Sequence, residues 1–274
     1  MRFHSLADDL NHPLFGTRAT SATLRKPSRA IPPSLEDGRI PTLNQTGYMT
    51  SELDEFSDDF INSAAAWAEK KLPVVDIGAA YGITAIPALA NNGIVIANDI
   101  GEEHLLHLRV KAGQELWPHL YLNNKRFPED LTFPNNSIGA IIMRSVAHYF
   151  KPTQMEVALD NANKWLTPGG ELYIITISPY HYSLGSFIKT YDEHWDTGNS
   201  WPGEILNLKK YIPDLAKDIP NYLHVMDERP LKKALETRGF EIVTSKLFGF
   251  ARSHSKDPKG IGYYGIKAIK HIMK

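Results

Sequence analysis

Apolar residues follow two different spacings over most of the chain. Short runs of consecutive apolar residues alternate with longer stretches in which apolar residues recur every three or four positions. The runs predict strands at 74–77, 94–97, 120–122, 138–143 and 172–177, and the stretches predict helices at 83–90, 102–115 and 154–166. Because most of these strands are apolar on both faces, the pattern is typical of a parallel sheet that helices cover on both sides.

Two segments depart from this alternation at its start. Residues 1–49 contain prolines at 13, 27, 32, 33 and 41 and show no regular apolar spacing, so we expect an irregular N-terminal arm or lid. From about residue 50 to 70, apolar residues recur at helical spacing from Leu53 to Trp67 and predict a helix. The main domain is therefore expected to span 50–274.

The second half of the chain contains an insertion and then returns to the earlier pattern. Residues 178–229 break the alternation of strands and helices. After them, 231–238 predicts a helix, 240–247 a strand and 262–269 a final edge strand. Thr153 and Glu156 have the spacing of a capping box, which predicts the start of the helix near 154.

Composition narrows the class of protein. Lys and Arg total 30 and Asp and Glu total 31, and a net charge of −1 gives no broad positive surface for nucleic acid, which we do not expect as a partner. The absence of cysteine excludes thiol catalysis and cysteine-ligated metals, and we predict no metal site. No run approaches 18 apolar residues and the N-terminus carries acidic residues, so we predict no membrane span, no signal peptide and a cytoplasmic location.

The most specific chemical signal is the turn after the first predicted strand, Asp76–Gly82, which reads Asp-Ile-Gly-Ala-Ala-Tyr-Gly. A glycine-containing turn between a strand and a helix lets a ligand approach the backbone at the carboxyl edge of a sheet. A dinucleotide site requires glycine where Ala80 stands, and Asp76 would repel its phosphates. The turn therefore favours a ligand that is positively charged and has no phosphate. A ligand-free strand–helix connection is the alternative.

A second carboxylate extends the predicted site. Asp99 closes the second strand, 17 positions after Gly82, near the place where nucleotide-binding folds put an acid on ribose hydroxyls. S-adenosylmethionine combines a ribose with a positive charge and lacks phosphate. The alternative for Asp99 is a helix N-cap, a position that aspartate favours.

Four segments, in order, resemble motifs of the class I S-adenosylmethionine-dependent methyltransferases, particularly the branch with small-molecule and lipid substrates. They are Asp76–Gly82, Val95–Asp99, Glu129–Ile138 and Leu166–Gly170. The resemblance covers about residues 50–178 well and 230–270 loosely. It implies an α/β fold with a doubly wound, mostly parallel seven-stranded sheet and helices on both faces. It also implies S-adenosylmethionine as methyl donor and S-adenosylhomocysteine as product.

The resemblance also implies which residues contact the cofactor. Gly78 and Ala79 are expected to approach its methionine part, with Asp76 attracting the ammonium group. Asp99 is expected to hold the ribose, and Tyr48 to close over the cofactor from the arm. The other residues predicted for the cofactor site are Tyr81, Gly82, Ile100, Phe127, Glu129, Asp130 and Arg144.

The predicted adenine end departs from the family pattern. The family's adenine-facing acid aligns with Phe127, and the acid that closes this motif aligns with Gly139. Phe127 is therefore a candidate for stacking on the adenine. Glu129 and Asp130 are the alternative candidates for contacting it.

The methyl-acceptor side is less specific. His148 and Tyr149 follow the fourth strand, whose end faces the transferred methyl group in the family, so both are catalytic candidates, with His148 as a general base or only a packing residue. Aromatic residues of the insertion form either a lid over substrate or a separate small core. They are Tyr180, His181, Tyr182, Trp195, Trp201 and Tyr211.

The sequence therefore predicts a methyltransferase that acts on an oxygen or nitrogen of an acceptor. Neutral overall charge and the insertion favour a small-molecule acceptor, while a protein acceptor stays open and the oligomeric state is not predicted. A non-catalytic S-adenosylmethionine or S-adenosylhomocysteine binder is the alternative. A nicotinamide-dependent oxidoreductase is a third reading, against which Ala80 and Asp76 count.

Overall fold

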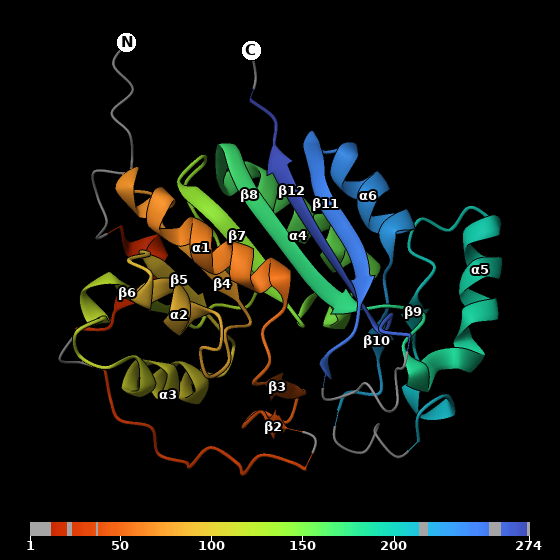
Figure 1. Ribbon diagram of the computed structural model, residues 1–274, viewed down its shortest axis with the longest axis horizontal. Helices are drawn as coiled ribbons and strands as arrows, with labels where there is room; N and C mark the ends of the chain where they lie inside the picture. The colour runs from red at the N-terminus through yellow and green to blue at the C-terminus, as the bar shows by residue number, and fades with distance from the viewer. Residues whose placement is uncertain (1–11, 21–23, 37, 214–218, 252–258, 273–274) are drawn as a thin grey trace.

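The fold centres on one eight-stranded sheet in a computed structural model, shown in Figure 1. The structure describes residues 12–20, 24–36, 38–213, 219–251 and 259–272. The strand order is β1-β6-β5-β4-β7-β8-β12-β11. Strands β6, β5, β4, β7 and β8 run parallel, and β12 is antiparallel to both of its neighbours, β8 and β11. The strands are β1 (Thr17–Arg18), β4 (Val74–Ile77), β5 (Val95–Asn98), β6 (Leu120–Asn123), β7 (Ile138–Arg144), β8 (Leu166–Ile177), β11 (Phe240–Phe248) and β12 (Tyr263–Lys270).

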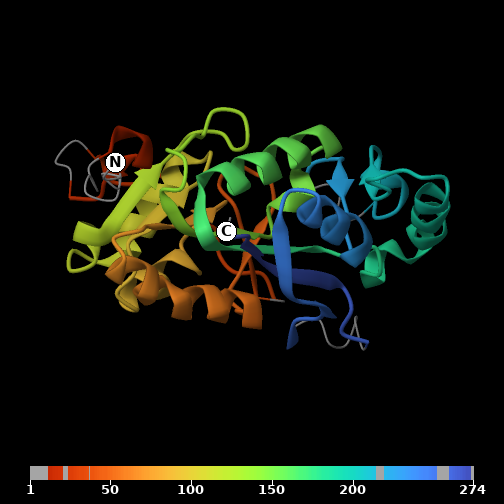
Figure 2. The same ribbon diagram turned by 90° about the horizontal axis from the view of Figure 1, so that it is seen from above.

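Helices cover both faces of this sheet, as Figure 2 shows from above. Side chains of α1, α2 and α3 pack with one face and those of α4 and α6 pack with the other. Successive residues of a strand point to opposite faces, so Val74 joins the first layer and Val75 the second. The helices are α1 (Glu55–Glu69), α2 (Ala85–Ala90), α3 (Glu102–Ala112), α4 (Pro152–Trp165), α5 (Ile188–Asp196) and α6 (Glu228–Glu236). The predicted α/β class is confirmed. No helix in the described part of the chain has the length and hydropathy needed to span a bilayer.

Two predictions about the sheet are wrong in detail. The sheet has eight strands rather than seven, because β1 of the arm pairs antiparallel with β6. The strand predicted as a final edge, β12, lies inside the sheet between β8 and β11, so β11 forms that edge. Local spacing identified β12 as a strand, but strand order depends on pairing between distant segments.

Local hydrogen bonds cap the starts of α1 and α4, and the cap of α4 differs from the predicted one. Helix α1 begins after Asp54, whose side chain accepts a hydrogen bond from Ser57 N at 2.9 Å. Helix α4 begins at Pro152, and Gln154 Oε1 accepts from Lys151 N at 2.9 Å. The predicted box of Thr153 and Glu156 is therefore wrong, since proline at the first helical position starts the helix earlier.

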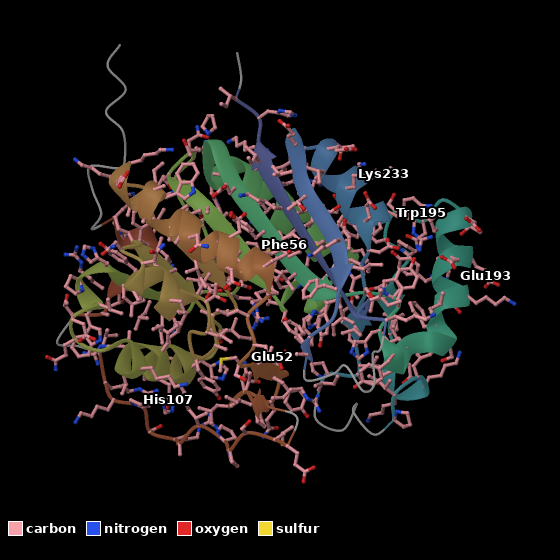
Figure 3. The ribbon with its side chains drawn as sticks, viewed as in Figure 1. Glu52, Phe56, His107, Glu193, Trp195 and Lys233 are labelled. Atoms are coloured by element: carbon pink, nitrogen blue, oxygen red, sulfur yellow. The ribbon has the colours of Figure 1, made fainter. Side chains whose placement is uncertain are left out.

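Helix α1 packs closely on the sheet through aromatic side chains. Phe56, labelled in Figure 3, lies in the first turn of α1 and faces β12, where a Cβ on Gly265 would overlap its ring. Near the other end, Trp67 packs over Gly139 of β7, where a Cβ would lie 2.6 Å from the indole. A side chain at position 139 would therefore overlap Trp67, so this packing requires glycine there.

The N-terminal arm wraps the body and ends below the carboxyl ends of the parallel strands (Figure 1). After β1, its residues 25–29 bond to α3, where Arg29 O lies 2.6 Å from Nε2 of His107 (labelled in Figure 3). Strands β2 (Arg39–Pro41) and β3 (Tyr48–Thr50) then pair with each other antiparallel. The arm is thus attached along its described length, although its sequence is irregular.

The insertion forms a small core of its own beside β8 and β12. It contains α5, β9 (Glu204–Ile205) and β10 (Leu223–His224), with 3₁₀ turns at Tyr182–Phe187 and Leu208–Lys210. Its buried cluster contains Leu184, Phe187, Tyr191, Ile205, Leu208, Leu223 and Val225, and Tyr211 packs against it. Trp201 instead joins the main core. These contacts favour the separate core over the aromatic lid.

Candidate functional site

A cavity of about 440 Å³ lies at the carboxyl ends of β5, β4 and β7. Its wall comes from the loops after these strands, from arm residues 42–49 and from Pro220 and Tyr222 of the insertion. Volumes of 300–1,000 Å³ are typical of small-molecule sites. Of the predicted site residues, the cavity is lined by Tyr48, Asp76, Gly78, Ala79, Asp99, Ile100, Phe127, Glu129, Arg144 and Tyr149.

The glycine turn folds tightly over the end of β5. The amides of Gly78 and Ala79 both donate to Asn98 O at 2.9 Å, which joins the turn to the neighbouring strand. Gly78, Ala80 and Gly82 have φ of 75°, 43° and 86°. A left-handed conformation is strained for Ala80, which stands where dinucleotide sites have glycine. In this conformation Ala80 N donates a hydrogen bond to Asp99 Oδ2 at 3.0 Å, which joins the turn at Asp76–Gly82 to the acid at the end of β5.

Asp76 lies at the base of the cavity with an unsatisfied oxygen. Its side chain is 2% exposed, and Oδ2 has no hydrogen-bond partner among the described residues. Burial raises the pKa of Asp76 to about 7, against the lowering effect of Arg144. A buried carboxylate without a partner is costly. The position therefore suits a ligand that brings a positively charged donor.

Asp99 connects the cavity to the arm through His104. Asp99 Oδ1 lies 2.7 Å from Gly101 N and 2.9 Å from His104 Nδ1. Leu43 N of the arm lies 3.0 Å from His104 Nε2 and 3.1 Å from the hydroxyl of Tyr81. Since Nε2 accepts from this amide, Nδ1 carries the proton and donates to Asp99.

Tyr81 and Gly82 support the site from behind rather than line it. The Tyr81 hydroxyl donates to Pro41 O of the arm at 3.1 Å. Gly82 N donates to Ala79 O at 2.8 Å and closes the turn. Neither residue belongs to the cavity wall.

The part of the cavity that is predicted to hold the adenine ring is lined by both apolar and acidic side chains. Ile100 is 56% exposed although it is apolar, and it lines the cavity beside Asp99. Phe127 is buried against Phe150 and Trp165, with ring centroids at 5.6 and 5.9 Å. It reaches the cavity from within this cluster.

Glu129 and Asp130 separate in the structure. Glu129 lines the cavity and accepts a hydrogen bond from Gln154 of α4. Asp130 is exposed outside the cavity wall.

Arg144 is committed to a buried ion pair. Its Nε donates to Asp54 Oδ2 and to Ser57 Oγ at 3.0 Å, and Nη2 donates to Glu52 O. Glu52, labelled in Figure 3, lies between β3 and α1. Arg144 therefore fixes the start of α1 beside the cavity, and its charge favours an ionised Asp76.

The two catalytic candidates occupy different environments. Tyr149 lines the cavity, and its hydroxyl approaches the arm so closely that a Cβ on Gly47 would overlap it. His148 is 3% exposed behind the wall, and its Nδ1 has no partner among the described residues. Burial, with His181 and His224 nearby, lowers the pKa of His148 to about 3. The ring is therefore neutral at physiological pH.

Several wall residues were not found by the sequence reasoning. They are Thr42, Asn44, Thr46, Gly47, Ile77, Ala80, Ile83, Thr84, Asn98, His104, Arg126, Ser145, Val146, Phe150, Gln154, Pro220 and Tyr222. Asn98 ends β5 and Ser145 follows the last residue of β7, and both strands were predicted, so these positions were a usable signal. The arm and insertion residues carried none, because only the tertiary fold brings them to the cavity. No group of three or more acidic or histidine side chains in the described ranges is arranged to hold a metal ion.

Comparison with known proteins identifies the class. A family model described as a methyltransferase domain matches residues 49–245, and the chain belongs to this family. The match confirms the resemblance to S-adenosylmethionine-dependent methyltransferases that the four motifs indicated. No curated protein matches the chain.

Solved structures share the fold at low sequence identity. A methyltransferase from Methanosarcina mazei is 17% identical with a TM-score of 0.55, over 73% of this chain and 93% of its own. Magnesium protoporphyrin IX methyltransferase from Synechocystis, with S-adenosylhomocysteine bound, is 16% identical with a TM-score of 0.51, over 79% and 84%. The N-methyltransferase NodS from Bradyrhizobium japonicum, also with S-adenosylhomocysteine, is 14% identical with a TM-score of 0.50, over 79% and 86%.

Proposed function

We propose that the cavity binds S-adenosylmethionine and transfers its methyl group to an oxygen or nitrogen of a small molecule. The observation that carries the proposal is the pair of buried carboxylates at the carboxyl ends of β4 and β5. Asp76 presents an oxygen without a partner, and Asp99 lines the same cavity. Two acids at this edge favour a cationic nucleoside over a phosphorylated one.

The residues present fit each part of this cofactor. Asp76 Oδ2 would satisfy the ammonium group of the methionine part, close to the backbone of Gly78 and Ala79. Asp99 has three protein donors and retains lone pairs for a ribose hydroxyl. Exposed Ile100 offers an apolar surface for the adenine ring, with Phe127 and Glu129 on the same wall and Tyr48 closing from the arm.

The protein's task in this reaction is to hold the nucleophile in line and exclude water. When bound, the cofactor would supply a methyl group attached to a positively charged sulfur. The acceptor atom would bond to the methyl carbon as the carbon–sulfur bond breaks, and S-adenosylhomocysteine would leave. Orientation alone contributes a large part of the rate in such bimolecular steps. Tyr149 is the candidate that touches the acceptor, because it lines the cavity. We assign His148, which is neutral and behind the wall, to packing.

A binding experiment tests the cofactor assignment. Asp99→Asn removes the charge that holds the ribose, and we expect the Kd for S-adenosylhomocysteine to rise at least tenfold in isothermal titration calorimetry, about 1.4 kcal/mol. Asp227→Asn is the matched control, because Asp227 is 5% exposed, Asp99 is 7% exposed, and Asp227 bonds to Tyr191 and Arg229 outside the cavity. Equal affinity of the wild type and Asp99→Asn would contradict the assignment.

Turnover tests the acceptor. S-adenosylmethionine with a labelled methyl group is incubated with the protein and with fractions of a cell extract separated by size. We expect label in compounds below about 1 kDa, since the wall encloses a cavity of about 440 Å³. Label found only in protein would replace the small-molecule acceptor with a protein acceptor. Label in neither fraction would favour the non-catalytic binder.

A further inference from the structure

A second hollow lies beside the cavity, between the arm and the insertion. This groove, of about 590 Å³, is lined by arm residues from Leu35 to Tyr48 and by Ile219 and Pro220 of the insertion. It shares four residues with the cavity wall, namely Thr42, Gly47, Tyr48 and Pro220. The two hollows are therefore neighbours that share part of their wall.

The position of the groove relates it to the acceptor rather than to the cofactor. The cofactor residues Asp99 and Asp76 follow β5 and β4, on one side of the cavity. Tyr149 follows β7, and the insertion follows β8, farther along the same edge. The groove thus adjoins the cavity beside Tyr149, since a Cβ on its residue Gly47 would overlap the Tyr149 hydroxyl.

The described residues that line the groove carry no charge. Five of its residues are apolar or aromatic, namely Leu35, Pro41, Tyr48, Ile219 and Pro220. The other three described lining residues are Thr42, Gln45 and Gly47, none of which is ionisable. A charged group placed here would lose hydration without gaining an ionic partner among the described lining residues.

Two features hold the groove in shape. The guanidinium carbon of Arg39 lies 4.4 Å from the ring centroid of Tyr48 and covers one face of that ring. Leu35 N donates to Arg39 O at 2.8 Å, and Gly38 N donates to Leu35 O at 2.9 Å. Leu35 is 39% exposed although it is apolar. Leu35 therefore adds exposed apolar surface to the groove.

From this shared wall and from the described lining, we propose that the groove is the acceptor subsite and that the acceptor is an uncharged, largely apolar molecule. This assignment rests on the proposed function of the adjoining cavity. The body of the acceptor lies between the arm and the insertion, and its nucleophilic atom points to Tyr149. Two segments remote in sequence therefore select the substrate together.

Two dyes of the same aromatic skeleton test the charge requirement. N-phenyl-1-naphthylamine is neutral, and 1-anilinonaphthalene-8-sulfonate adds one anionic group. In fluorescence titrations of the wild type with saturating S-adenosylhomocysteine, we expect the neutral dye to bind at least fivefold more tightly. Equal or tighter binding of the sulfonate, or no binding of the neutral dye, would overturn the proposal.

A pair of variants locates the dye. Leu35→Glu places a charge in the groove, and we expect it to weaken binding of the neutral dye at least fivefold. Leu14→Glu is the matched control, because Leu14 is 38% exposed on the same arm and does not line the groove, so its affinity should match the wild type. Equal effects of the two variants would overturn the location.

The affinity for S-adenosylhomocysteine is measured in the same proteins to separate the two proposals. If S-adenosylhomocysteine binds and the neutral dye does not, only the acceptor assignment is overturned. If S-adenosylhomocysteine does not bind, the proposed function fails and the acceptor assignment fails with it.

Discussion

Under the proposed function, Asp76 would link cofactor binding to a proton, because its side chain is buried and Oδ2 has no hydrogen-bond partner among the described residues. Burial raises its pKa from 3.8 to about 7, so folding favours the protonated form. The stability that protonation contributes is present below pH 4 and is lost as the pH rises to about 7. A bound ammonium group would favour the ionised carboxylate and lower this pKa.

The resulting prediction is that S-adenosylhomocysteine binding releases a proton. At pH 6 the free protein carries a protonated Asp76, so binding should release up to about one proton, and at pH 8.5 almost none. Calorimetry at pH 6 in two buffers with different ionisation enthalpies measures the release. Asp76→Asn should abolish it, and a release that persists in this variant would contradict the assignment.

At the residue scale, the sequence was informative where the chemistry is local. Asp76, Gly78 and Ala79 lie on one turn, so their spacing alone brings them together. His104 is different, since it matters through Leu43, which is remote in sequence and reaches it only after the arm has wrapped the body. Asp130 is a residue that the sequence indicated but that lies outside the cavity wall, because a position in a motif does not determine which way the side chain points.

At the element scale, the Arg144–Asp54 pair joins the end of β7 to the N-cap of α1. Both side chains are almost fully buried, at 5% and 2% exposure. Removing one partner of a buried pair leaves the other charged and desolvated, which costs far more than the pair itself contributes. The pair therefore fixes where α1 begins relative to the cavity.

We predict that Arg144→Ala lowers the free energy of unfolding by about 3 kcal/mol. Lys246→Ala is the control, because Lys246 pairs with Glu55 at the surface and both side chains are about half exposed. It should change the free energy of unfolding by less than about 1 kcal/mol. Urea denaturation measures both values. Similar losses in the two variants would show that burial of the pair is not decisive.

The elements of the core were predictable because their periodicity is strong. The five parallel strands and their helices were predicted in the right order. Most ends are shifted by a few residues, as at α4, where the Lys151–Gln154 cap decided the start, whereas β8 begins at Leu166 rather than at the predicted 172. The place of β12 in the strand order was not predictable, because nothing in its own sequence indicates that it pairs antiparallel with both β8 and β11.

At the scale of the whole molecule, the arm and the insertion meet over the carboxyl edge of the sheet (Figure 1). The arm lies almost entirely before the residues 49–245 that match the family model, the insertion lies within them, and both lack regular spacing. Their convergence depends on bonds such as Tyr81 to Pro41 and on the insertion's own core. Sequence reasoning could therefore locate the cofactor side of the site but not the acceptor side.

Strand β1 also has a consequence for the solution behaviour of the molecule. It occupies the outer edge of β6, whose Leu120, Tyr121 and Leu122 form an apolar strand. An uncovered edge of this kind recruits the same strand of another copy. We therefore expect a chain that starts at Thr20 to aggregate, while one that starts at His12 keeps the state of association of the full chain in light scattering. A monodisperse chain starting at Thr20 would contradict this. If the expected aggregation is observed, the arm's first strand is a safeguard against association, independent of any role in catalysis.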